Sequence, residues 1–241
     1  MWEAAADPQQ VPDGAMVAYT VTTPSIEDDR SRTRIWVVAV ASGETWALTD
    51  GEGSERAPRW APDGKSIGFV SSREDGQQIW RVAPKAGTPT RIGKLADGVS
   101  DFLWAPDGSA IYFTTDVAWS DSTEAARRAG AYPTKAKIWT DLFYRHWNEW
   151  RLGVRSHLFR LGLDGAVTDL TPIDHDVPPL ALGGRDIAVA PDGSELALVY
   201  NPDSNIAVST NNEVYTIASS GGTPRLVSSS RGNDNTPLYS P

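Results

Sequence analysis

The tripeptide Pro-Asp-Gly occurs four times in the chain, and its recurrence restricts the folds that the chain can adopt. The copies begin at Pro12, Pro62, Pro106 and Pro191, so successive copies lie 50, 44 and 85 residues apart. In such a turn, proline presets φ at the first central position, aspartate suits the second, and glycine accepts the positive φ that lets a second strand return. Intervals of roughly 40 to 50 residues are typical of β-propeller blades.

Each copy is followed by three further stretches that favour β-strands. The second strands are "RIWVVAV", "QQIWRVA", "SHLFRLGL" and "NEVYTIA", a third strand follows a short turn, and a fourth leads into the next Pro-Asp-Gly. A parallel α/β sheet would need helices of ~10–15 residues between its strands, and the sequence contains no such amphipathic segments. We therefore expect an all-β chain: a β-propeller of four-stranded blades, with repeats near 11–60, 61–104, 105–189 and 190–239.

The propeller is expected to be incomplete, with about four blades in residues 1–241. Pro241 lies 50 residues after Pro191, where a fifth Pro-Asp-Gly would begin. We therefore interpret the chain as the N-terminal part of a longer propeller. An open edge on the last blade would recruit a partner, so the missing blades of the parent chain and a homo-oligomer are both expected partners.

Tryptophan recurs at fixed positions in the repeats. Trp60 and Trp104 share one position, and Trp36 and Trp80 share another. Recurrence at a fixed position favours packing between blades over a surface that stacks ligands.

The third repeat is longer than the others by about 35 residues, which we assign to an insert at about 116–155. Residues 120–157 contain seven Lys or Arg and four Asp or Glu, in a chain whose net charge is −9. Long insertions in a regular scaffold are often functional. The segment "YRHWNEW" supplies six candidate substrate-binding residues: Tyr144, Arg145, His146, Trp147, Glu149 and Trp150. The alternative is a structural strand extension in which Arg145 and Glu149 pair with each other.

Composition excludes several other functions. An acidic chain repels phosphate backbones, so we expect no nucleic-acid partner. The absence of cysteine excludes disulfides and thiolate nucleophiles. No apolar run approaches the ~20 residues of a membrane span, so we expect a soluble protein of the cytoplasm or periplasm. The sequence has no phosphate loop or dinucleotide motif, and its one match to Gly-x-Ser-x-Gly, residues 64–68, belongs to a Pro-Asp-Gly hairpin and not to a nucleophile elbow. We therefore expect no catalytic residue, cofactor or metal site. His175, between two aspartates, is interpreted as a loop residue.

Several segments together resemble one family of enzymes. They are "PRWAPDGKSIGFVSSR", "FLWAPDGSAIYFTTD", "DLFYRHWNEW" followed by "RSHLF", "DLTPIDHDVPPLALGG", and "APDGSELALVY" followed by "STNNEVY". From about Gln10 onward the chain resembles the N-terminal propeller of prolyl oligopeptidase-family serine peptidases, within the acylaminoacyl-peptidase and dipeptidyl-peptidase branches. The "RHW-x-EW" segment is more specific than the Pro-Asp-Gly repeats, which Tol-system propellers share.

The resemblance implies a propeller of seven or eight blades that covers the active site of a C-terminal α/β-hydrolase domain. That domain holds the Ser-Asp-His triad and is absent from this chain, so we expect a non-catalytic portion of an enzyme that gates access of short peptides. Acidic propeller side chains bind the free amino terminus of the peptide in dipeptide-releasing members, and Glu149 is our candidate for this role. The alternative functions are a stand-alone Tol-type interaction propeller and, more remotely, a propeller glycosidase.

Overall fold

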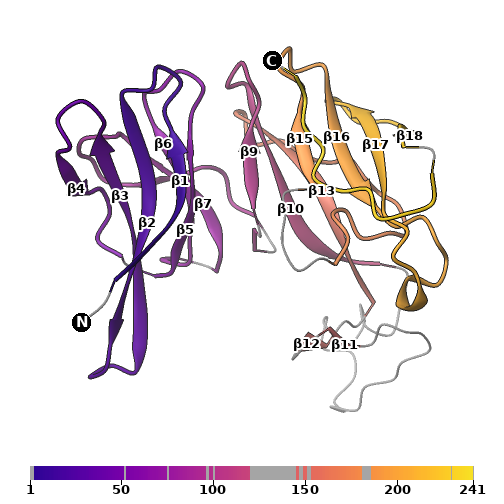
Figure 1. Cartoon of the computed structure of the whole chain (residues 1–241), viewed down its shortest axis with the longest axis horizontal. Coiled ribbons are helices and arrows are strands. Elements are labelled where there is room, and N and C mark those ends of the chain that lie inside the picture. The colour runs from indigo at the N-terminus through magenta and orange to yellow at the C-terminus, as the bar shows by residue number, and fades with distance from the viewer. Residues whose placement is uncertain are drawn as a thin grey trace. The chain divides into compact units, whose positions relative to one another are not determined.

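The computed structural model describes the chain except for residues 1–2, 52, 75, 96–97, 100, 120–144, 147–148, 151–152, 181–185, 229 and 241. Its strands form four antiparallel sheets of four strands each (Figure 1). The first sheet contains β1 (Ala4–Gln10), β2 (Met16–Ser25), β3 (Arg30–Ala39) and β4 (Thr45–Ala47). The second contains β5 (Glu55–Trp60), β6 (Ile67–Ser71), β7 (Gln78–Val82) and β8 (Thr90–Arg91).

The third and fourth sheets repeat this meander. The third contains β9 (Phe102–Trp104), β10 (Ala110–Ala118), β13 (Val154–Gly162) and β14 (Val167–Asp169). The fourth contains β15 (Ile187–Val189), β16 (Glu195–Tyr200), β17 (Glu213–Ala218) and β18 (Arg225–Leu226). A separate hairpin joins β11 (Arg145–His146) to β12 (Glu149–Trp150), and η1 (Ile206–Val208) is the only helical turn among the described residues. The predicted all-β class with four-stranded sheets is confirmed.

The chain divides into two compact units. One comprises residues 1–113 and 160–168, and the other comprises residues 114–159 and 169–241. Within the described residues, no helix is long and apolar enough to cross a membrane.

The four Pro-Asp-Gly turns share one geometry, which explains their recurrence. In each turn the glycine has a φ between 67° and 76°, and its N–H donates to the carbonyl three residues earlier at 2.8–2.9 Å. The aspartate side chain accepts a hydrogen bond from the N–H two residues later, as Asp63 does from Lys65 at 3.0 Å. The turn joins the strand before the triplet to the strand after it, so each sheet begins one strand earlier than the corresponding sequence repeat. The repeat limits themselves remain a prediction.

In three of the sheets, a side-chain hydroxyl just after the last strand accepts a hydrogen bond from a main-chain N–H of the third strand. Thr49 accepts from the N–H of Ile35, Thr171 from that of Leu158, and Ser228 from that of Val214, each at 2.9 Å. The hydroxyl replaces a main-chain carbonyl where the short last strand ends, which satisfies a donor that would otherwise lack a partner.

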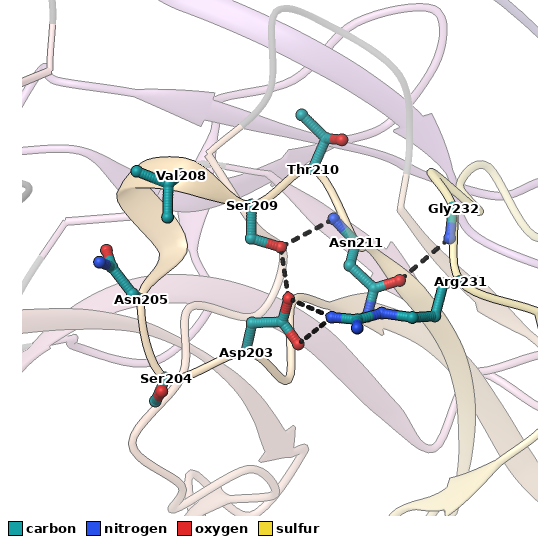
Figure 2. A pocket seen from close by; sticks show the side chains of 9 residues that line it. All are labelled: Asp203, Ser204, Asn205, Val208, Ser209, Thr210, Asn211, Arg231 and Gly232. Carbon is teal, nitrogen blue, oxygen red and sulfur yellow. Dashed lines mark hydrogen bonds and ion pairs between the residues drawn. The ribbon is translucent and has the colours of Figure 1, made fainter.

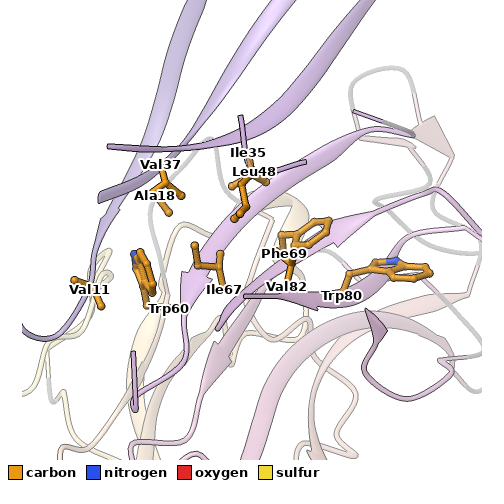
Figure 3. Close-up of a cluster of buried hydrophobic side chains, with 10 residues drawn as sticks. All are labelled: Val11, Ala18, Ile35, Val37, Leu48, Trp60, Ile67, Phe69, Trp80 and Val82. Atoms are coloured by element: carbon orange, nitrogen blue, oxygen red, sulfur yellow. The ribbon is translucent and has the colours of Figure 1, made fainter. Parts of the chain in front are cut away.

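The first and second sheets share a hydrophobic core within one unit (Figure 3). Its buried members are Val11, Ala18, Ile35, Val37 and Leu48 from the first sheet or the residues flanking its strands, and Trp60, Ile67, Phe69, Trp80 and Val82 from the second. The predicted packing role of Trp60 and Trp80 is therefore confirmed. Trp36 is only partly buried and does not belong to this cluster.

Two tryptophans also bond to the main chain of the preceding sheet. Nε1 of Trp60 donates to the carbonyl of Gln9 at 2.9 Å, and Nε1 of Trp104 donates to the carbonyl of Arg59 at 3.2 Å. Gln9 and Arg59 hold the same position relative to their Pro-Asp-Gly triplets. The recurring tryptophan thus joins successive sheets by packing and by a repeated hydrogen bond.

Candidate functional site

The candidate functional residues lie in two loops. Each loop connects the second strand of a sheet to the third strand, one in the third sheet and one in the fourth. In the third sheet this connection joins β10 to β13 and contains the "YRHWNEW" segment. In the fourth sheet the corresponding connection, residues 201–212, joins β16 to β17. Loops held by a rigid sheet are the usual location of binding residues.

The "YRHWNEW" segment contains a short β-hairpin. β11 and β12 pair antiparallel, with Arg145 opposite Trp150 and His146 opposite Glu149. The residue opposite Glu149 in this register is therefore His146. The alternative of an Arg145–Glu149 pair also remains a prediction. Arg145 is exposed. Tyr144 and Trp147 lie outside the described residues, and the substrate-binding role of all six candidates remains a prediction.

The two ends of the predicted insert meet at the third sheet. The N–H of Trp119 donates to the carbonyl of Gly153 at 2.8 Å. The indole of Trp119 packs edge-on against the ring of His157, with ring centroids 5.2 Å apart. His157 is fully buried, and its two ring nitrogens lie 2.7 Å from the Asp169 carboxylate and 3.0 Å from the carbonyl of Ile173. This buried histidine therefore fixes the point at which the connection leaves the sheet.

The loop after β14 follows β13 closely and carries His175. Arg155 bonds to Asp174 at 2.9 Å, and the N–H of Ser156 donates to Asp176 at 2.9 Å. His175 stacks on Tyr200 at the end of β16, with ring centroids 5.2 Å apart, and partial burial lowers the pKa of its imidazole. The two aspartates beside His175 thus bond to groups on β13, which agrees with the interpretation of His175 as a loop residue.

Tyr200 stacks in turn on Tyr215 of β17. Their ring centroids are 3.9 Å apart and the rings are 14° from parallel. Burial, together with a hydrogen bond to Tyr215, raises the pKa of the Tyr200 phenol well above its ordinary value. The three rings form an aromatic stack that supports the start of the β16–β17 connection.

A polar hollow of about 610 Å³ opens within this connection (Figure 2). It is lined by Asp203, Ser204, Asn205, Val208, Ser209, Thr210, Asn211, Arg231 and Gly232. Asp203 lies at its centre and accepts hydrogen bonds from the Ser209 hydroxyl at 2.7 Å and the Arg231 guanidinium at 3.1 Å. The Ser209 hydrogen bond, helped by Arg231, lowers the pKa of the Asp203 carboxyl.

The lining of this hollow presents both hydrogen-bond donors and acceptors. Its lining combines one carboxylate, one guanidinium, hydroxyls and amides. Within the described residues no group of three or more His, Cys, Asp or Glu side chains is placed to hold a metal ion. Sequence reasoning missed the hollow because its residues come from two separate segments. The signal that could have indicated it is the turn-rich run "NPDSN" directly after a strand.

The chain is similar to known peptidases. No protein-family model matches it. It is 28% identical over 239 residues to dipeptidyl-peptidase 5 of Porphyromonas endodontalis, an alignment that covers 95% of this chain and 34% of the relative. The chain therefore spans about a third of the length of the curated dipeptidyl-peptidase relatives that it matches.

Solved structures show the same fold. An acylaminoacyl peptidase of Pyrococcus horikoshii superposes with a TM-score of 0.68 at 14% identity, over 96% of this chain and 33% of that one. TolB of Acinetobacter baumannii superposes with a TM-score of 0.57 at 17% identity, over 97% of this chain and 45% of that one. At these identities the structures show the fold alone, and they confirm the predicted β-propeller class. The two relatives that match along 95% of the chain are both named dipeptidyl-peptidase 5. The comparisons therefore support the predicted resemblance of the chain to the β-propeller portion of prolyl oligopeptidase-family peptidases.

Proposed function

We propose that the chain is the non-catalytic, substrate-gating propeller portion of a serine peptidase that cleaves short peptides, of the dipeptidyl- or acylaminoacyl-peptidase type. The observation that carries this proposal is the similarity to dipeptidyl-peptidase 5 along 95% of the chain, which spans only 34% of the relative. The α/β-hydrolase domain with its Ser-Asp-His triad would then lie in the remainder of the parent protein. TolB shares the fold, but its likeness supports no sequence relationship at 17% identity.

The experiment compares the isolated chain with the full-length protein on chromogenic dipeptidyl and acylaminoacyl substrates. The full-length protein is expected to turn over and to be inactivated by serine-directed reagents. The isolated chain is expected to be inactive, because its one match to Gly-x-Ser-x-Gly, residues 64–68, lies in the turn between the antiparallel strands β5 and β6 and not in a strand-to-helix nucleophile elbow. Turnover by the isolated chain, or a full-length protein that hydrolyses no peptide, would overturn the proposal.

Within this function, we propose that the β11–β12 hairpin binds the N-terminal part of the peptide, with Glu149 as the partner of its ammonium group. A partly desolvated carboxylate makes a charge-assisted hydrogen bond worth roughly 1.5–3 kcal/mol, about ten- to a hundredfold in affinity. Tyr144, Trp147 and Trp150 would form apolar walls, and an indole face also attracts a cation. Arg145 and His146 complete the hairpin, and the register makes His146 the cross-strand neighbour of Glu149.

Glu149→Gln in the full-length protein tests this role. We expect kcat/KM on free-amine dipeptidyl substrates to fall roughly ten- to a hundredfold, a much smaller loss on N-blocked substrates, and an unchanged melting temperature. Glu124→Gln, which makes the same change elsewhere in the predicted insert, is the matched control and should leave both activities unchanged. Equal losses on the two substrate types, or a loss of stability alone, would assign Glu149 a structural role.

A further inference from the structure

The hairpin formed by β2 and β3 extends beyond the rest of its sheet. The β2–β3 ladder runs from Met16↔Ala39 out to Ser25↔Arg30. Among the described residues, which exclude residues 1–2, β1 pairs with β2 as far as Thr22, and β4 pairs with β3 only from Trp36. The outer part of the hairpin, residues 22–33, therefore projects as a two-stranded arm, which Figure 1 shows reaching past β1 and β4. The hydroxyls of Thr22 and Thr33 bond across its base at 2.9 Å.

Arginines line one face of the stem of this arm. Arg30, Arg32 and Arg34 alternate along β3, and residues at this spacing lie on the same face of a strand. The stems of Arg32 and Arg34 lie against Gly51, where an added Cβ would stand 3.0 Å and 2.8 Å from their Cγ atoms. Within the described part of the chain, none of the three guanidinium groups forms an ion pair or a hydrogen bond. Two of them, Arg30 and Arg32, are exposed.

The tip of the arm carries the opposite charge. Glu27, Asp28 and Asp29 follow one another in the loop between the strands, and all three are exposed. The loop is ordered by Ser25, whose hydroxyl donates to the Asp28 carboxylate at 3.0 Å and accepts from the Asp28 N–H at 3.2 Å. Ile26 beside them is 93% exposed. Together with Arg34 at its base, the arm is therefore neutral in sum but polar along its length, with three acids at the tip and three arginines along one face of β3.

We propose that this arm is an interaction surface for a second copy of the chain, with the two arms side by side in opposite directions. A two-fold axis then places the acidic tip of each arm against the arginine stem of the other, which satisfies both charge clusters at once. Arginine suits such contacts because its planar guanidinium binds carboxylates through two hydrogen bonds. A purely acidic partner fits less well, because the acidic tip of the arm would repel it. The surface is small, so the association is weak and depends on ionic strength.

Charge-reversal variants of the full chain test the arm by sedimentation velocity over a concentration series at low ionic strength. The stem variant carries Arg30→Glu and Arg32→Glu, and the tip variant carries Glu27→Arg and Asp28→Arg. The wild-type chain is expected to dimerise, and each variant alone is expected to have a dimer dissociation constant raised about tenfold or more. An equimolar mixture of the two variants is expected to dimerise again, because the acidic tip of one meets the arginine stem of the other.

A matched control separates the arm from net charge. Arg81→Glu with Lys85→Glu makes the same charge change at exposed positions of the second sheet and should dimerise as the wild type does. A chain that carries both the stem changes and the tip changes has a basic tip and an acidic stem, so two copies are again complementary. Its dimerisation would show that the single-cluster variants lose association without losing their fold. If the wild-type chain is monomeric at all concentrations, the proposal is overturned. The charges of the arm would then serve to keep its exposed strand edges from aggregating. Unaltered dimerisation of either variant, or a mixture that stays monomeric, would also overturn it.

Discussion

Gly68→Ala tests the close approach of the second and third sheets. Gly68 in β6 has an ordinary φ, so a Cβ causes no backbone strain there. The added atom would stand 2.9 Å from Cζ and 3.0 Å from Cε2 of Phe102, and 3.1 Å from Cζ2 of Trp104. Phe102 is only 1% exposed and packs edge-on against Trp104, so neither ring can move aside freely. One methyl group therefore overpacks this contact.

Overpacking of this kind costs about 1–3 kcal/mol. In a chain of this size, that loss corresponds to a melting temperature lower by roughly 2–10 °C. Gly232→Ala is the matched control, because Gly232 also has an ordinary φ and a Cβ there would meet nothing within 4 Å. It should be neutral or stabilising by up to about 1 kcal/mol, through the reduced entropy of the unfolded chain.

Thermal and urea unfolding of the two variants measure this difference. The double variant Gly68→Ala, Phe102→Leu is expected to be less destabilised than the sum of the two single changes, because the smaller side chain makes room for the methyl group. If Gly68→Ala and Gly232→Ala have equal stabilities, or if the two changes at the contact are additive, the contact between the sheets is looser than described.

Two pH-dependent effects are also expected. Glu55 bonds to the Thr49 hydroxyl and, at 2.5 Å, to Arg73, and burial raises the pKa of its carboxyl. The folded state therefore binds more protons than the unfolded state, and it loses stability as the pH rises from the ordinary value of 4.5 through the folded pKa. Glu55→Gln should therefore flatten the change in the urea midpoint above pH 4.5, and an unchanged slope would contradict this. At the hollow, the Ser209 hydrogen bond lowers the pKa of the Asp203 carboxyl. Asp203 therefore stabilises the fold at pH values above its ordinary pKa of 3.8, and this stabilisation is lost as the pH falls through its folded pKa. Ser209→Ala should raise the pKa of Asp203 in a carboxyl NMR titration, and an unshifted titration would show that this hydrogen bond is weak.

Local chemistry made the fold class predictable. The Pro-Asp-Gly turns depend on three adjacent residues, and their geometry is the same in all four sheets. The recurrence of Trp60 and Trp104 at one position indicated packing between sheets, and the structure adds their shared hydrogen bond to the preceding strand. The family resemblance likewise rested on contiguous segments and was confirmed by the peptidase relatives.

Contacts between distant residues could not be predicted in this way. The hollow brings Asp203 and Ser209 together with Arg231, more than twenty residues further along the chain, and turn signals do not show which loops meet. The cross-strand neighbour of Glu149 depends on the register of a hairpin, and a shift of one residue would change every pair. The sequence shows alternating arginines directly after three acids, but it does not show that they form an arm. Only the structure shows that β2 and β3 extend beyond their neighbours there, because strand length depends on which main-chain groups find partners across the sheet.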